Sequence, residues 1–409
     1  MIKIKGKYLK AIEDFIEIFV LKEWWKVLAL PQYQNLVSTI YSLQKKYLYE
    51  INTQKMIETE IYKFVAEQID KNEKIPDINQ GLKSELKNRL ITTFESYPRE
   101  YLVRFEMPKF PDWGEFDIKI TDKIKIVSGK HDFDPYNIEN LPKASRLVQA
   151  LRGYPGTVYL QIDVKGYGDE QANSPAIASA ISIAKQCAFV MTTFGIMQKE
   201  YYSPSKARAT LEAKKQKYVI PVELPGSMRD CYLIKPIEID LKIYDKDSEF
   251  TLLGDPGRAP NTNQEKIDAF TTKLYPLTNY FLHSKHPDFL SISAAIEWYQ
   301  DSKYSDNQTF SYLAACIGLE ALLGTDEYMD QMSKRLTDRF ATLMGKGKTQ
   351  RNNMAKEYIK VLQLRGEIVH AKQARLTPKH QETLTTVQQM LLDVIWRELH
   401  QMYKQSKNW

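Results

Sequence analysis

Apolar positions recur at helical spacing near both ends of the chain and alternate with polar positions in between. Near the start, the runs "YLKAIEDFIEIFVLKEWWKVLAL" and "MIETEIYKFVAEQI" repeat apolar residues three and four positions apart, which predicts helices. The segment "EKIPDINQG" carries Pro and Gly, so it predicts a break between helices. We therefore predict a helical N-terminal region over residues 1–98.

The pattern changes at about Arg99. The segments "EFDIKITDKIKIVSG" and "GTVYLQIDVKGYG" alternate apolar and polar residues, and "YVIPVELPG" and "CYLIKPIEIDLKIYD" have similar content, which predicts strands. Between them, residues 174–197 predict an apolar helix. "SPSKARATLEAKKQKY" is polar and basic, which predicts an exposed loop or short helix. Residues 99–255 are thus predicted to form an α+β middle domain.

A Gly-, Pro- and Asn-rich segment, "GDPGRAPNTNQE", precedes the last block of helical periodicity and predicts a linker over 256–263. The fold class predicted for the whole chain is α+β and multidomain, mainly helical, with an all-α bundle over 264–409. The helices predicted in this bundle span 264–283, 290–302, 308–323, 328–345, 353–371 and 378–405.

Composition bears on the cellular setting. The three cysteines are scattered and odd in number, which argues against a disulfide framework or a zinc site and favours a reducing cytoplasm. The charged start "MIKIKGKYLKAIEDF" is untypical of a secretion signal. The apolar segment 174–197 contains Lys185, so we expect a buried helix there and no membrane partner.

Positive charge is concentrated near the C-terminus. From Lys334 to Lys379 there are twelve Lys and Arg and three Asp and Glu, a net +9 against +6 for the whole chain. Such a surplus is typical of a surface that binds a polyanion. The alternative is a set of solvated helix faces with no ligand.

The stretch "VLQLRGEIVHAKQARL" carries the candidate chemistry. Met354, Tyr358, Val361 and Val369 follow helical spacing, and Arg365 lies in line with them. His370 follows five positions later, about 140° around a helix of 3.6 residues per turn. The two side chains can therefore converge only where they reach around a groove or where the helix ends.

A second charged residue lies on an apolar stripe. In "NQTFSYLAACIGLEALLG", Phe310, Leu313, Ile317 and Glu320 share one predicted helix face. Glu320 could neutralise Arg365, or Arg339 of the next helix. A buried ion pair with a purely structural role is the alternative.

Three segments, "YLAACIGLEALLG", "MSKRLTDRFATLMG" and "LQLRGEIVHAK", resemble the Apea-like branch of the HEPN domains over roughly residues 264–409. The resemblance implies a metal-independent endoribonuclease without a cofactor, which pairs as a homodimer and serves in anti-phage defence or as a toxin. It implies that Arg365 and His370 are catalytic, with Glu320 and Arg339 in support. The residue after the motif arginine is often polar in this family, and here it is Gly366; Glu367 could take over that role.

The same residue types suit RNA cleavage on chemical grounds. RNA carries its own nucleophile, the 2′-OH, so cleavage needs a proton acceptor, a proton donor and positive charge at the phosphorus. Histidine titrates near neutral pH, and arginine binds phosphate oxygens in pairs. The RNA contacts expected around the motif are Lys346, Lys348 and Arg351 in a basic loop, and Lys372 and Arg375 after the motif.

The partners predicted are therefore RNA (tRNA or another cellular RNA), a second copy of the chain and a phage-derived trigger. Two alternatives stay open: a catalytically silent HEPN module that binds RNA or protein, and a structural dimerisation bundle.

Overall fold

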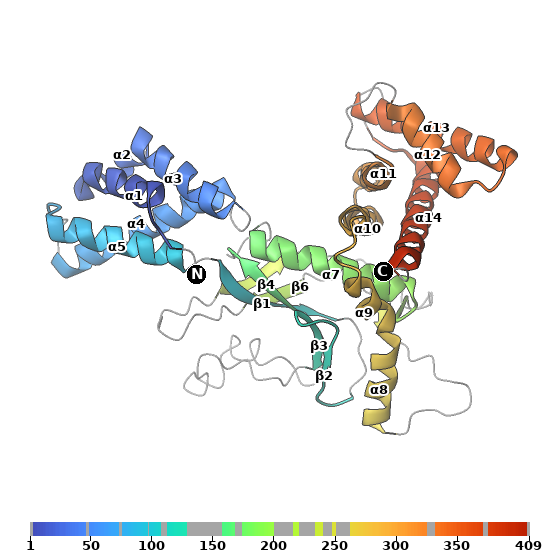
Figure 1. Ribbon diagram of the computed structural model, residues 1–409, viewed down its shortest axis with the longest axis horizontal. Helices are drawn as coiled ribbons and strands as arrows, with labels where there is room; N and C mark the ends of the chain where they lie inside the picture. The colour runs from blue at the N-terminus through green and yellow to red at the C-terminus, as the bar shows by residue number, and fades with distance from the viewer. Residues whose placement is uncertain are drawn as a thin grey trace.

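The protein is mainly helical and contains a small antiparallel sheet (Figure 1). This computed structural model describes the following residues: 3–45, 49–72, 76–96, 98–107, 113–128, 158–167, 174–199, 216–220, 234–239, 248–250, 262–324, 332–370 and 375–406. The coarse expectation of a mostly helical α+β protein is confirmed.

The N-terminal helices enclose a core of their own. They are α1 (Lys7–Ile18), α2 (Trp24–Val27), α3 (Pro31–Gln44), α4 (Glu50–Asn72) and α5 (Gln80–Glu95), with a 3₁₀ turn over Leu21–Glu23. The first predicted helix is broken at this turn. The Asn79 side chain accepts a hydrogen bond from the N–H of Leu82 and caps α5, which explains why the predicted break ends there.

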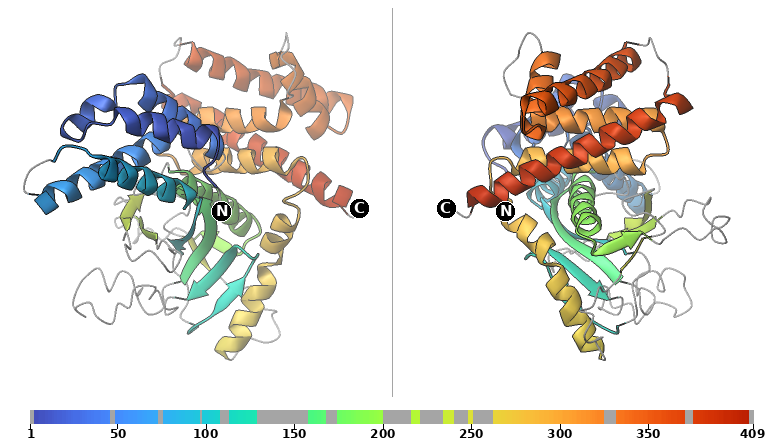
Figure 2. Two further views of the ribbon diagram at one scale, coloured as in Figure 1. Left: turned by 60° about the vertical axis from the view of Figure 1, so that its left-hand side comes forward. Right: turned by 90° about the vertical axis from the view of Figure 1, so that its right-hand side faces the viewer.

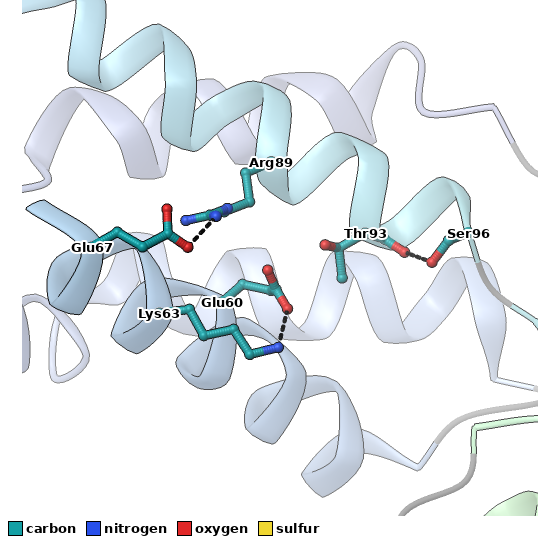
Figure 3. Close-up of polar contacts among 6 residues, drawn as sticks. All are labelled: Glu60, Lys63, Glu67, Arg89, Thr93 and Ser96. Carbon is teal, nitrogen blue, oxygen red and sulfur yellow. Dashed lines mark hydrogen bonds and ion pairs between the residues drawn. The ribbon is translucent and has the colours of Figure 1, made fainter. Parts of the chain in front are cut away.

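An ion pair links α5 to α4 on one side of this helical unit (Figure 3). Arg89 of α5 donates from Nη2 to Oε1 of Glu67 at 2.6 Å and lies over the ring of Phe64. Burial lowers the pKa of Arg89, but the carboxylates of Glu67, Glu60 and Glu85 outweigh it and raise the pKa. The guanidinium therefore stays charged and holds the two helices in register.

The four-stranded sheet is antiparallel throughout, with the order β1-β4-β3-β2. Its strands are β1 (Arg99–Glu106), β2 (Asp117–Lys119), β3 (Ile124–Ser128) and β4 (Val158–Gly166). Along β4, Val158, Leu160, Ile162 and Val164 are buried in alternation with more exposed residues, because one face of the sheet packs on the core. The strands predicted from "EFDIKITDKIKIVSG" and "GTVYLQIDVKGYG" are confirmed for the described residues, and the first segment forms a hairpin of β2 and β3.

Two further strand pairs accompany the sheet. They are β5 (Met197–Lys199) with β8 (Ser248–Phe250), and β6 (Gln216–Ile220) with β7 (Ile234–Ile239). The two predicted strand segments around β6 and β7 are confirmed for the residues described. The basic segment predicted as a loop lies outside the described residues except for its last residues, which belong to β6.

Helix α7 (Pro175–Thr193) lies between the sheet and the C-terminal helices (Figure 2). Within the described part of the chain, α7 is the one helix whose length and composition would allow it to cross a membrane. However, 56% of its apolar window is buried within the protein. Ala180, Ala184, Cys187 and Val190 are fully buried, and Lys185 pairs with Asp301 of the bundle. These contacts are those of a core helix.

The C-terminal helices form a bundle with short connections. They are α8 (Asn263–Lys273), α9 (Tyr275–Leu282), α10 (Phe289–Tyr304), α11 (Gln308–Leu323), α12 (Met332–Met344), α13 (Lys348–Val369) and α14 (Gln381–Ser406). The predicted helix over 264–283 is two helices, because Pro276 cannot continue the hydrogen bonding of α8 and instead occupies the first turn of α9.

The beginning of α13 corrects another prediction. The helix starts at Lys348 and not at 353, so Lys348 and Arg351 lie on its first turns and not in a loop. The side chain of Gln350 accepts a hydrogen bond from the N–H of Lys346, and Arg351 donates to the carbonyl of Gly345. These contacts hold the turn before α13 in place. The Gly and Lys content of this segment predicted a loop and gave no sign of these contacts.

The sheet, α7 and the bundle share one continuous hydrophobic core, whereas the N-terminal helices have a separate one. Trp113 beside the sheet, for example, meets Phe270 of α8 with ring centroids 5.6 Å apart. The predicted linker ends where α8 begins, since Thr262 and Glu265 form the capping box at the start of this helix. The segments predicted as middle and C-terminal domains therefore pack as one unit.

Two helical glycines generate a stability prediction. A Cβ at Gly318 of α11 would lie 2.7 Å from Leu391 and 3.2 Å from Trp298, whereas a Cβ at Gly366 would meet nothing within 4 Å. Gly318→Ala should lower the free energy of unfolding, since overpacking costs about 1–3 kcal/mol and outweighs the helix-propensity gain. Gly366→Ala should raise it by about 0.5–1 kcal/mol. Urea denaturation checks both; equal effects would contradict the close approach at Gly318.

Candidate functional site

Helix α11 has a buried face and an exposed face, and the candidate acid lies beside the exposed one. Tyr312, Ala315 and Leu319 are fully buried against the bundle. On the opposite side, Phe310 is 44% exposed and Ile317 is 36% exposed. The predicted apolar stripe is therefore not a packing face, because the close approach at Gly318 turns the other side of α11 inward.

Helix α13 leaves the core as it approaches the motif. Tyr358 and Val361 are buried, and Tyr358 stacks on Phe340 of α12 at 4.9 Å between ring centroids. Farther along the same stripe, Arg365 is partly exposed and Val369 is 52% exposed. Arg365 thus lies in line with Tyr358 and Val361, as predicted, but burial on this stripe ends before the arginine, while Leu364 and Ile368 beside it still pack on the core.

Arg365 and Glu320 meet between α13 and α11. Nε of Arg365 lies 3.4 Å from Oε1 of Glu320, and their side chains are 36% and 24% exposed. Glu320 thus pairs with Arg365, as one of the predicted alternatives had it. The pair is partly open to solvent and is not a buried ion pair, whereas the alternative that its role is structural stays a prediction.

Arg339 lies elsewhere. It is exposed on α12, and its Nη1 donates to the carbonyl of Gly324 at 2.8 Å, just past the end of α11. A cation there satisfies a free carbonyl at a helix C-terminus. Arg339 also faces Glu398 of α14, and it lowers that residue's pKa against a larger upward effect of burial. Its position is that of a helix-end contact, and within the described part of the chain no hydrogen bond or ion pair joins it to Glu320.

His370 forms the C-terminal cap of α13. Its N–H donates to the carbonyls of Gly366 and Ile368, and its side chain is exposed. Because α13 ends at this residue, the side chain of His370 does not have to point about 140° away from Arg365, as it would on a continuing helix. Glu367 is exposed as well, and space beside Gly366 is open.

The predicted RNA contacts are solvent-exposed where the structure describes them. Lys346, Lys348, Arg351 and Arg375 are all exposed, and Lys372 lies outside the described residues. Figure 1 shows α12 and α13 as a pair at one end of the bundle. Lys356 and Lys360 on α13 are exposed too, so the helix that carries Arg365 presents several cations to solvent.

Two buried residues beside the pair were not found from the sequence. The Tyr312 hydroxyl donates to the carbonyl of Val361 at 2.7 Å and ties α11 to α13 one turn before Arg365. Cys316 lies in the same layer, and burial raises the pKa of its thiol to about 12, so it stays protonated and unreactive. Both belong to the motif "YLAACIGLE", but only the packing of the helices shows their contacts.

Comparison of the chain with protein-family models, curated proteins and solved structures finds no match. Within the described part of the chain, no group of three or more His, Cys, Asp and Glu residues could hold a metal ion. The candidate site is thus defined by the pair Glu320–Arg365, by His370 at the end of the same helix, and by the cations around them.

The exposure of the Arg365–Glu320 pair generates a prediction. Exposed ion pairs contribute little to stability, so a double-mutant cycle with Arg365→Ala and Glu320→Ala should give a coupling energy below about 1 kcal/mol. Each variant should stay folded, as judged by circular dichroism and urea denaturation. A coupling of about 3 kcal/mol or more would instead indicate a structural ion pair.

Glu398 generates a pH prediction. Burial and Asp288 raise its folded-state pKa above the ordinary carboxyl value, so ionisation disfavours the fold. The stability that Glu398 contributes is fully present below its unfolded-state pKa of about 4.3 and is lost as pH rises through the folded-state pKa. Glu398→Gln should therefore stabilise the protein at pH 7 relative to wild type, and the difference should vanish in acid. A stabilisation independent of pH would exclude ionisation as its cause.

Proposed function

We propose that this chain is a metal-independent endoribonuclease of the HEPN type, with Arg365 and His370 as its catalytic residues. The observation that carries the proposal is the half-open pair Arg365–Glu320 on a helix that ends in an exposed histidine. A guanidinium held at the surface by one carboxylate keeps donors available for a phosphate. The helical C-terminal bundle and the three motif segments support the same family.

The chemistry follows from these side chains. An imidazole accepts the proton of the RNA 2′-OH, and the 2′-oxygen attacks the adjacent phosphorus. The bond from phosphorus to the 5′-oxygen breaks, and that oxygen takes a proton from a second imidazole. Arg365 stabilises the negative charge that develops on the phosphorane. The products are a 2′,3′-cyclic phosphate and a free 5′-OH, and the reaction needs no oxidant, cofactor or metal.

A second copy of the chain completes this site. One copy supplies one motif histidine, whereas the reaction uses a proton acceptor and a proton donor. Phe310, Ile317 and Val369 are exposed apolar side chains on the two helices that carry the pair. Burying them against their symmetry mates would bring two Arg365 and two His370 side chains to one cleft. The open space at Gly366 permits close approach there.

The cations of α13 suit the substrate. Lys346, Lys348 and Arg351 precede the motif on the same helix or its turn, and Arg375 follows it. Contacts of this kind bind the phosphate backbone without reading sequence. The RNA bound would be a tRNA or another cellular RNA, with Glu367 in a supporting position.

The cellular role that fits is cytoplasmic defence against phage, in which RNA cleavage stops the infected cell and a phage-derived trigger activates the enzyme. The N-terminal helices and the sheet would then restrain or target the bundle. A catalytically silent HEPN module is the second candidate, favoured by the lack of a polar side chain at Gly366. A structural dimerisation bundle is the third, favoured by the exposed apolar side chains alone.

His370→Ala should abolish cleavage of purified cellular RNA while the protein stays folded and dimeric, because its proton acceptor and donor are lost. The matched control is His400→Ala, which removes an exposed histidine of α14 outside the motif and should leave activity unchanged. Gel analysis of the RNA, with detection of 2′,3′-cyclic phosphate ends, provides the readout. Activity should persist in EDTA.

Three outcomes would contradict the proposal. Cleavage that persists in His370→Ala would exclude the histidine, and activity abolished by EDTA would exclude a metal-independent reaction. RNA binding without cleavage, with and without extract from phage-infected cells, would favour the silent module.

A further inference from the structure

A cleft of about 340 Å³ lies between α7 and α10, and its lining contains none of the residues of the proposed ribonuclease site. Its polar wall contains Ser182 and Gln186 of α7 and Glu297 of α10, and its apolar wall contains Phe289, Leu290 and Trp298. A concave site of this size with a few polar groups among apolar ones is typical of a small-ligand site.

The polar wall is held in place from behind. The Tyr280 hydroxyl donates to Oε1 of Gln186 at 3.1 Å and also contacts Oγ of Ser293 at 3.0 Å. Gln186 donates in turn to Oγ of Ser182 at 3.2 Å. Lys185 pairs with Asp301 at 2.5 Å, which neutralises that carboxylate at the end of the cleft. The side chains of the cleft are therefore positioned before any ligand arrives.

Glu297 is the charged residue of the cleft that has no counter-ion among the described residues. Its Oε1 accepts hydrogen bonds from Ser182 at 2.5 Å and from Gln186 at 3.4 Å. Both donors are neutral, and in the described part of the chain no Lys, Arg or His lies within ion-pair distance of Glu297. Its second oxygen, Oε2, accepts no hydrogen bond from the described residues. A carboxylate oxygen in a partly apolar cleft is a strong site for a cationic donor.

The apolar wall of the cleft determines which chemical group the ligand carries beside its cation. Leu290 is 79% exposed, so a ligand that covers it removes apolar surface from water. Leu290, Ala294 and Trp298 are spaced four residues apart, so they form one stripe along α10 beside Glu297. An indole ring also attracts cations over its face.

We propose that this cleft binds a ligand with an ammonium or guanidinium group on a small apolar or aromatic body. The cation pairs with Glu297, and the body lies on Leu290, Ala294 and Trp298. The ligand is a free amine or the side chain of a Lys or Arg residue in a peptide. Because Trp298 also lies against Gly318 of α11, an occupied cleft bears on the helix that carries Glu320. The binding itself does not depend on the proposed ribonuclease activity.

Calorimetric titration of the full chain tests the proposal with matched probes. Phenethylamine and 2-phenylethanol share a body and differ in charge; N-acetyl-arginine amide and N-acetyl-citrulline amide do the same for a peptide side chain. Wild type should bind at least one cationic probe about tenfold or more tightly than its neutral match, the ratio expected for a charge-assisted hydrogen bond. Whichever cationic probe binds identifies the source of the ligand.

The variants separate the site from nonspecific binding. Glu297→Gln should remove the preference for the cation, Ala294→Leu should abolish binding by filling the cleft, and Glu382→Gln on α14 should change nothing. Circular dichroism checks that each is folded, and Ala294→Leu decides the matter if Glu297→Gln does not fold. Equal affinity for charged and neutral probes, no binding of any probe to wild type, or unchanged binding in a folded Ala294→Leu variant would overturn the proposal.

Discussion

The close packing of α11 against α10 and α14 determines where the candidate chemistry lies. At Gly318 the helix approaches Leu391 and Trp298 so closely that a Cβ would collide, and this contact turns Tyr312, Ala315 and Leu319 inward. Phe310 and Ile317 must then face solvent on the other side. Glu320 is left at the edge of that exposed surface, where it holds Arg365. The proposed dimer and the proposed active site are thus two consequences of one helix orientation.

The same helices connect the bundle to the rest of the protein. Helix α7 lies between the sheet and α10, so the sheet and the bundle share one core. The joint is polar on one side, where Glu297, Ser182 and Gln186 line the cleft, and apolar elsewhere. A ligand in that cleft would contact both α7 and α10. Such a position suits control of the bundle by the rest of the chain, which is the division of roles that the proposed defence function requires.

The sequence predicts the helical elements well because their periodicity is strong, and all the helices expected after the linker are present apart from a break at Pro276 and shifted ends. It also offers the pairing of Glu320 with Arg365 as one of two alternatives, the other being Arg339, and the structure shows the first. It does not predict which face of α11 is buried, because the apolar residues on both faces of "YLAACIGLEALLG" allow either orientation and only the packing at Gly318 decides. The turn before α13 and the Tyr312 hydrogen bond depend on tertiary contacts in the same way.

The central claim is that His370 cleaves RNA. Sequencing of RNA 5′-hydroxyl ends, in cells that express either the wild-type chain or His370→Ala at equal levels, tests it most directly. The account predicts a set of new 5′-hydroxyl ends in the wild-type cells that is absent with His370→Ala. Identical ends in both samples under phage infection, with both proteins folded, would contradict it.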